Sequence, residues 1–249
     1  MIRLSGYGKT KRLLCLALLS LALGDSGCSE GRVKTTEIPG PYDRPTLIAV
    51  APALNFSGSS DFDPVQVADL FTSELTMVEG IGVVGVNRVM AVLSRQGLKE
   101  VGSPGHALEI CETAGCDGIV VIAITEYDPY TPVVGMAAQL YMNRLGGMWG
   151  RLDPVAVSRR ATPFPVEESQ DSPHRPRAQV QCVFNTAHNA TAERVRLYAE
   201  DRGAEQSALG WRKYLESQRL FLRYCCWEVV GEMMGQEYHR MMAGATDRE

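Results

Sequence analysis

The segment 119–125, IVVIAIT, constrains the fold more than any other part of this sequence. A run of apolar and β-branched residues without polar alternation is typical of a strand that is buried on both faces. Such a strand lies in a sheet that helices cover on both sides. Residues 46–54, TLIAVAPAL, have the same character. The sequence therefore predicts strands inside a covered sheet.

Helical segments alternate with these strands. Asp63 and the proline after it are expected to cap and begin a helix whose apolar residues recur at helical spacing. A short strand over residues 80–85 follows, and Asn87 is expected to cap the next helix. Ser103 and its proline are expected to open a third helix that ends at Gly115. This alternation indicates an α/β layer.

The second half of the sequence adds further strands and then helices. Residues 133–143 are expected to form an antiparallel partner of the strand 119–125, and residues 178–185 one more strand. Residues 191–202 are expected to be a helix with Leu197 facing partly inward, and residues 211–242 continue the helical pattern. The predicted fold class is α/β, with a mixed, partly parallel sheet flanked by helices and a long C-terminal helix packed on it.

The N-terminal residues have the order of a signal peptide. Basic residues precede an apolar run at 13–23, and no acidic residue occurs before Asp25. The run has about the length of a signal-peptide core and is too short to span a bilayer. Export from the cytoplasm is therefore expected.

Two processing outcomes remain open. The residues before Cys28 fit the end of a bacterial lipobox, in which the cysteine becomes lipidated, although Asp25 stands where that pattern prefers leucine. Cys28 is thus the candidate lipidation site, and Ser29 after it favours the outer membrane by resemblance to lipoprotein sorting rules. Acyl chains such as palmitate would then hold the protein on the membrane, facing the periplasm. Cleavage after Gly24 would instead release a periplasmic or secreted protein.

The chain is expected to divide at these features. Residues 1–27 are expected to be the signal peptide, and residues 28–45 the lipidated cysteine with a flexible, proline-containing tether. Residues 46–145 are expected to form an α/β domain and residues 146–178 a loop-rich insertion. Residues 179–249 are expected to supply the final strand and the C-terminal helices that complete the same domain.

Ser26 lies in Gly-Asp-Ser-Gly, the letters that surround the nucleophile of trypsin-like proteases. A nucleophilic serine needs a histidine base and an orienting carboxylate. Ser26 falls before the expected cleavage point, and no trypsin-like series of short strands surrounds it. No catalytic residue is therefore expected, and the protein is not expected to be an enzyme.

The cysteines outside the signal peptide and anchor are odd in number, which argues against a fully paired disulfide framework. One or two bridges are compatible with the sequence, but the spacing assigns none. Cys111 and Cys116 lack a second pair at zinc spacing, and they are expected to be a core helical cysteine and a helix-end cysteine. Cys225 and Cys226 are expected to pack in the core, with a vicinal disulfide as the lesser alternative.

Two further motifs suggest ligands but are incomplete. Asp61 and Asp63 lack the other ligands of a calcium loop. Gly80, Gly82 and Gly85 match G-x-G-x-x-G, but they bracket a short strand, whereas dinucleotide-binding glycines follow one. Neither a metal nor a cofactor is expected.

Two motifs resemble a family of cell-envelope domains. Residues 48–52, IAVAP, are followed by Asn55, Ser57 and Gly58, and residues 114–121 read AGCDGIVV. Over residues 48–142 the chain resembles the N-terminal domain of the periplasmic Tol-Pal translocation protein. It also resembles that domain's relatives among curli-secretion lipoproteins and lipoprotein activators of penicillin-binding proteins. Ala53 departs from the family, which usually has phenylalanine there. The resemblance implies a small α/β domain that binds partners and carries no active site.

These observations predict a non-enzymatic bacterial envelope lipoprotein whose periplasmic domain binds other envelope proteins during envelope assembly or transport. Its membrane contact would run through the lipid at Cys28, and association with copies of itself is left open. A net charge of −4 gives no basic footprint for nucleic acid. The alternatives are a component of an oligomeric outer-membrane secretion channel of the curli-secretion type and a secreted soluble periplasmic protein. Residues 133–143 do not offer the paired amphipathic hairpins of such a channel.

Overall fold

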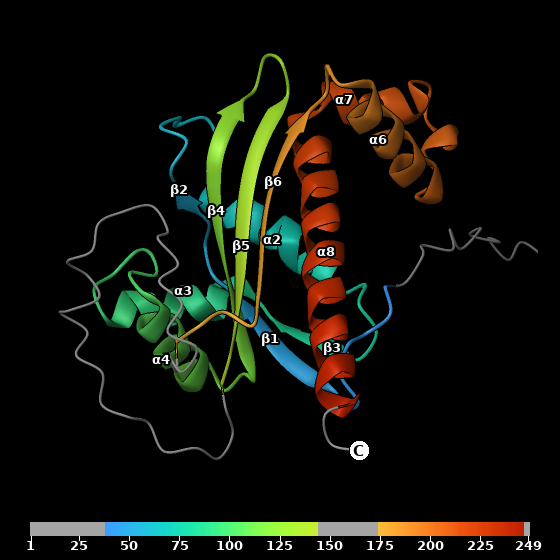
Figure 1. The fold of residues 1–249 in the computed structure, drawn as a ribbon. Helices are drawn as coiled ribbons and strands as arrows, with labels where there is room; N and C mark the ends of the chain where they lie inside the picture. Colours follow the sequence, from blue (N-terminus) through green and yellow to red (C-terminus); the bar gives the residue numbers. More distant parts are fainter. Residues whose placement is uncertain (1–37, 144–173, 247–249) are drawn as a thin grey trace, which may run out of the picture. The chain divides into compact units, whose positions relative to one another are not determined.

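The computed structural model describes residues 38–143 and 174–246 (Figure 1). Its elements are β1 Thr46–Val50, β2 Leu54–Asn55, α2 Pro64–Leu75, β3 Ile81–Val84, α3 Val86–Arg95, α4 Pro104–Ala114, β4 Gly118–Asp128, β5 Val133–Met142, β6 Ala178–Asn185, α6 Asn189–Asp201, α7 Lys213–Glu216 and α8 Gln218–Thr246. Short 3₁₀ turns, Ala204–Gln206 and Gly210–Arg212, lie between α6 and α7. Ser26 and Cys28 lie outside the described residues, as does most of the expected insertion.

The strands form one mixed sheet in the order β3-β1-β4-β5-β6, and β2 also pairs with β4. β1 is parallel to β3 and β4, whereas β5 is antiparallel to β4 and β6. This arrangement confirms the predicted α/β class with a partly parallel sheet. The apolar run 46–54 forms β1 only as far as Val50, because Pro52 has no N–H to donate to the ladder.

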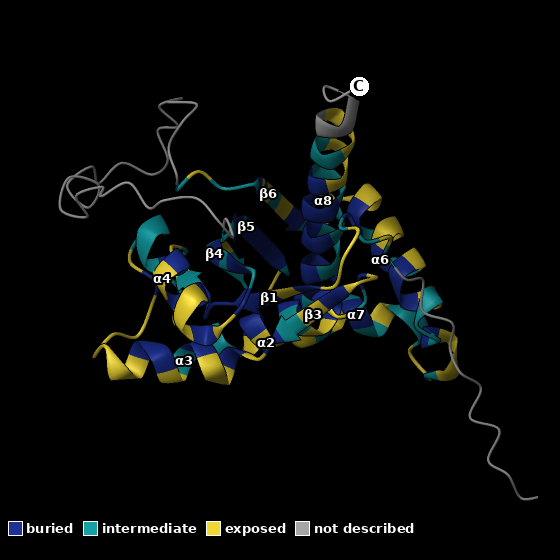
Figure 2. Cartoon of the chain, turned by 90° about the horizontal axis from the view of Figure 1, so that it is seen from below, coloured by how far each residue is buried: buried dark blue, intermediate teal, exposed yellow. Residues whose placement is uncertain are grey.

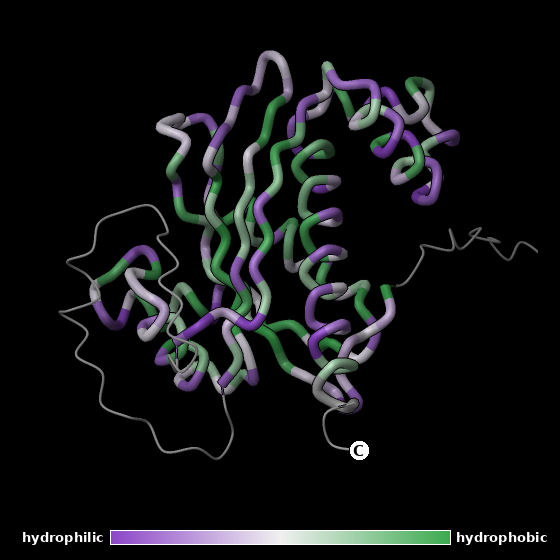
Figure 3. The backbone as a smooth tube through the Cα atoms, viewed as in Figure 1, coloured by the Kyte–Doolittle hydropathy of each residue, from purple (hydrophilic) through white to green (hydrophobic). Residues whose placement is uncertain are grey.

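The sheet has helices on both faces. On one face, α2 and α8 pack against β1, β5 and β6, with α6 at the end of this layer. On the other face, α3 and α4 cover β1 and the first part of β4. Figure 2 shows the inward sides of these helices buried, and Figure 3 shows long hydrophobic stretches on the central strands. No helix among the described residues is both long and apolar enough to cross a membrane.

Helix ends follow the sequence signals at three of the four predicted sites. Asp63 accepts a hydrogen bond from the Val65 N–H, and Ser103 accepts one from the His106 N–H. Gly115 ends α4 in the left-handed region, with φ of 71°. The prediction for Asn87 is wrong, because α3 already begins at Val86 and Asn87 lies within its first turn.

The C-terminal helical region differs from its prediction in detail. Helix α8 packs on β5 and β6 as expected, but the helical pattern breaks at Ser217, between α7 and α8. Leu197 was expected to face inward, yet it is 55% exposed, because Val195 and Tyr198 form the buried side of α6.

A buried ionic cluster joins α2 to α6 and α8. Glu74 of α2 is fully buried, and its carboxylate accepts hydrogen bonds from Arg202 Nη2 and Arg223 Nε, each at 2.6 Å. The Tyr198 hydroxyl donates to the same carboxylate at 3.1 Å. The Arg202 guanidinium stacks on the Tyr198 ring. A buried carboxylate is tolerated only when it is paired, so this cluster fixes the helices relative to one another.

The segment 38–42 departs from the expected flexible tether. Ile38 forms a parallel bridge with Val78, and its N–H donates to the Met77 carbonyl at 3.1 Å. A Cβ at Gly40 would overlap the Glu79 carbonyl oxygen, so the backbone approaches there as only glycine permits. The tether prediction is therefore wrong for these residues, which are packed against the domain.

Candidate functional site

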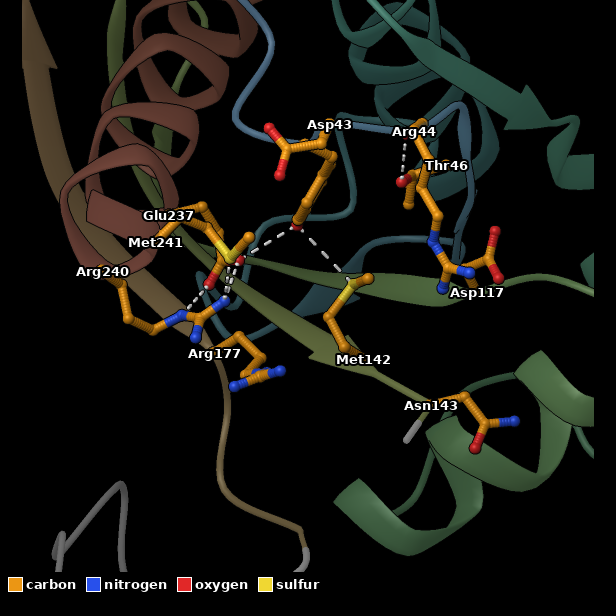
Figure 4. Close-up of a pocket in the computed structure, with 11 residues that line it drawn as sticks. Asp43, Arg44, Thr46, Asp117, Met142, Asn143, Arg177, Glu237, Arg240 and Met241 are labelled. Carbon is orange, nitrogen blue, oxygen red and sulfur yellow. Dashed lines mark hydrogen bonds and ion pairs between the residues drawn. The ribbon is translucent and has the colours of Figure 1, made fainter. Parts of the chain in front are cut away.

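A pocket of about 700 Å³ lies where the N-terminal segment meets the end of α8 (Figure 4). The N-terminal segment, the β4–β5 region, the start of β6 and α8 all contribute to its wall. Its lining residues are Tyr42, Asp43, Arg44, Thr46, Asp117, Met142, Asn143, Arg177, Glu237, Arg240 and Met241. Acidic and basic side chains both line it, so the pocket does not select one sign of charge.

Glu237 of α8 is fully buried at the centre of this wall. Its carboxylate accepts two hydrogen bonds from Arg240, from Nε and Nη2, both at 2.7 Å. It also accepts one from the Tyr42 hydroxyl at 3.2 Å. Burial raises the pKa of Tyr42 above its ordinary value, and the neighbouring Glu237 charge raises it further. Tyr42 therefore stays protonated and donates to Glu237.

Asp117 on the opposite wall also holds backbone together. Its carboxylate accepts a hydrogen bond from the Leu47 N–H at 2.8 Å, and its own N–H donates to the Leu47 carbonyl at 2.7 Å. The Asn143 N–H donates to the Asp117 carbonyl at 2.7 Å. Among the described residues that line the pocket there is no serine, cysteine or histidine, so these residues do not pair a nucleophile with a histidine base. The pocket is built as a joint between the N-terminal segment and the domain.

A second surface runs along the outer edge of β6. The Gln179 N–H points away from β5 and donates to the Gln236 side chain of α8 at 3.1 Å. Because backbone groups alternate between the two sides of a strand, the N–H groups of Gln181 and Val183 point the same way. Neither has a hydrogen-bond partner among the described residues. Val183 is also 60% exposed.

The side chains around this edge set its chemistry. The strand reads AQVQCVFN, with neither charge nor proline. The carboxylates of Glu228 and Glu232 on α8 lie close enough to Cys182 to raise the pKa of its thiol, although burial raises it more. Arg194 lies near the same thiol and pairs with Glu228 at 3.6 Å, so an incoming strand would meet Glu232 and this ion pair on the α8 side and Val183 on the other side.

The residues singled out from the sequence have structural positions in the described part of the chain. Asp63 caps α2, while Gly80 and Gly85 flank β3. Cys225 and Cys226 are fully buried, as expected for core packing. Sequence reasoning missed Tyr42 and Glu237, because 195 residues separate them along the chain.

No protein-family model matches the chain, and no curated protein matches its sequence. Solved structures to which the chain is similar include lipoprotein GNA1162 from Neisseria meningitidis, at 15% identity and a TM-score of 0.41, covering 66% of this chain and 99% of that one. The C-terminal domain of LpoB from Salmonella enterica matches at 14% identity and a TM-score of 0.35, covering 53% and 86%. LpoB from E. coli matches at 11% and 0.33, covering 43% of this chain and 51% of that one.

At these low identities and TM-scores, the likenesses assign this chain neither a family nor a function. The resemblance to the Tol-Pal translocation domain continues to rest on sequence motifs. In the structure the first motif forms the end of β1 and the turn after it, in which the Asn55 side chain accepts the Ser57 N–H at 3.1 Å. The second motif connects the end of α4 to the start of β4.

Proposed function

We propose that the chain is a non-enzymatic bacterial envelope lipoprotein, anchored through lipid at Cys28, whose α/β domain binds an extended segment of another envelope protein along β6. The outer edge of β6 carries this proposal, because the strand is uncharged and its N–H groups beyond Gln179 have no partner among the described residues. Native proteins ordinarily protect an edge strand with charge, proline or a bulge. Addition of a partner strand is a common way to use such an edge.

The partner segment has a defined chemistry in this proposal. Its backbone would bond to Gln181 and Val183, which gives affinity with little sequence preference. A basic side chain on the α8 side would face Glu232, whereas Glu228 is already paired with Arg194. An apolar side chain on the opposite side would cover Val183.

The hydrogen bond between Tyr42 and Glu237 attaches the N-terminal segment to the domain that carries β6. Tyr42 and Glu237 hold residue 42 on the domain, so the packed part of the chain begins before residue 46, where the domain was expected to start. The outer membrane, facing the periplasm, is the proposed location, on the strength of Ser29.

The anchoring half is tested by a Cys28→Ser variant expressed with its natural signal. Wild type is expected in the membrane fraction with acyl chains detected by mass spectrometry, and the variant in the soluble fraction without them. A variant that stays in the membrane and still carries lipid would overturn the anchor.

The proposal that β6 binds a partner is tested with a photo-crosslinking amino acid at Val183 in cells. The same probe at Leu98 is the exposed control. A crosslink to another envelope protein from position 183 alone supports the proposal. A crosslink to a second copy of the chain would favour the oligomeric alternative. Equal crosslinking from both positions, or none from 183, would contradict the proposed surface.

A further inference from the structure

The thiols of Cys111 and Cys116 lie against one another at the junction of α4 and β4. Their Sγ atoms are 2.7 Å apart, and the two side chains are 0% and 8% exposed. Each thiol also reaches the other residue's carbonyl, at 3.1 Å and 3.2 Å. The backbone closes the same turn, because the Cys116 N–H donates to the Cys111 carbonyl at 3.0 Å.

This separation is too short for two unbonded sulfur atoms. Unbonded carbon atoms prefer about 3.5–4.0 Å, and sulfur is larger. A covalent S–S bond is about 2.05 Å, so a small rotation of the two side chains reaches bonding distance. We propose that Cys111 and Cys116 form a disulfide bond in the mature protein, which staples the end of α4 to the start of β4.

The bond forms by exchange with a disulfide oxidant, either a protein disulfide of the cell envelope or glutathione disulfide. The Cys116 thiolate attacks one sulfur of the oxidant and releases the other as a thiolate. The Cys111 thiolate then attacks the mixed disulfide at Cys116 and releases the second thiolate. The two thiol protons go to the leaving thiolates, and the two electrons reduce the oxidant to a dithiol.

The environment favours Cys116 as the first nucleophile. The hydrogen bond from Cys111 lowers the pKa of the Cys116 thiol, whereas the same contact and burial raise the pKa of Cys111. Cys116 is also the more exposed of the two. A low-pKa, reachable thiol is the one that begins exchange.

The disulfide would lie at a turn between α4 and β4 that already carries two other structural features. Gly115 turns the chain with a positive φ, and Asp117 binds both backbone groups of Leu47 on β1. A bond across this turn holds α4 and the pocket wall at Asp117 together. Cys225 and Cys226, in contrast, are fully buried on α8, and no hydrogen bond joins either sulfur to another cysteine among the described residues, so we expect them to remain thiols.

In cells the bridge depends on the proposed envelope location, because disulfides persist in oxidising compartments. The experiment therefore has one arm in cells and one with purified protein. The full chain, expressed with its natural signal, is trapped with N-ethylmaleimide in denaturant and digested with an endoproteinase that cleaves after glutamate. Cleavage at Glu109, Glu112 and Glu126 separates Cys111 from Cys116, so the peptides 110–112 and 113–126 stay joined only through a disulfide.

We expect the two peptides to be joined in protein from cells and to separate after reduction, while Cys225 and Cys226 are alkylated throughout. If both cysteines are alkylated in cells but join in purified protein treated with glutathione disulfide, the bridge stands and the envelope location fails. If they are alkylated in both arms, the disulfide is overturned.

As a second readout, a reductant should lower the Tm of the wild type and leave the Tm of a Cys111→Ala, Cys116→Ala double variant unchanged. An equal shift in both proteins would also count against the bridge.

Discussion

The two edges of the sheet differ in how they are protected. β3 at one edge is short, Ile81–Val84, and the N-terminal segment pairs beside it, since Ile38 bridges to Val78. β6 at the other edge spans Ala178–Asn185, and among the described residues only its Gln179 N–H is bonded on the outer side, by the side chain of Gln236. Within the described part of the chain this edge is long and uncharged, and a partner strand is the occupant that we propose for it. The comparison therefore sets a short edge strand against the edge strand that is proposed to bind.

The largest loss of stability is expected when the buried ionic cluster at Glu74, which joins α2 to α6 and α8, is broken. Glu74→Ala leaves the Arg202 side chain, which is 9% exposed, without its carboxylate. Loss of one partner of a buried ion pair costs about 3–5 kcal/mol in free energy of unfolding. Chemical denaturation measures this, and Glu193→Ala on the outer surface of α6 is the matched control with no measurable change.

A smaller effect confined to the β3 side is expected from Glu237→Ala. The Tyr42 hydroxyl loses its acceptor, so the N-terminal segment is released at a cost of about 1–3 kcal/mol. Hydrogen exchange should accelerate at the amides of Ile38 and Glu79 and stay unchanged along β6. Unchanged exchange at Ile38 would show that the joint does not hold the segment.

Gly40→Ala is expected to release the same N-terminal segment by disrupting a different contact. The added methyl group overlaps the Glu79 carbonyl, so the segment must shift away from β3. The same amides should exchange faster, although Glu237 and Tyr42 are intact. Protection equal to wild type would refute the close approach at Gly40.

The smallest effect is expected from Tyr42→Phe. At neutral pH the lost hydrogen bond costs about 1 kcal/mol. Because burial raises the folded-state pKa of Tyr42, its stabilisation is fully present below the unfolded value of about 10 and is lost as pH rises above it. The gap in stability between wild type and variant should therefore narrow above about pH 10, as measured by denaturation at several pH values. A gap that widens there would contradict the assigned burial of Tyr42.

Local signals predicted most elements of this fold. Asp63 and Ser103 cap helices as expected, because a cap depends on residues within one turn. Contacts between distant residues could not be predicted: the Tyr42–Glu237 and Glu74–Arg202 pairs follow from the packing of α8 and α6 on the sheet. The packed segment at Ile38 has the same origin, since its partner, Val78, lies on another element. The edge of β6 was predicted as a strand, but its exposure depends on the strand order.

The central claim, that a partner strand pairs with β6, is tested most directly with Val183→Pro. The substitution removes an N–H that points away from β5, so the ladder within the sheet keeps its hydrogen bonds. The variant is tested with a photo-crosslinking probe at Gln181. We predict that Val183→Pro lowers the yield of the crosslinked partner about tenfold, because the partner strand loses its hydrogen bond to the Val183 N–H. Gly82→Lys on β3 should leave the yield unchanged. A folded Val183→Pro variant that crosslinks as well as wild type would contradict the account.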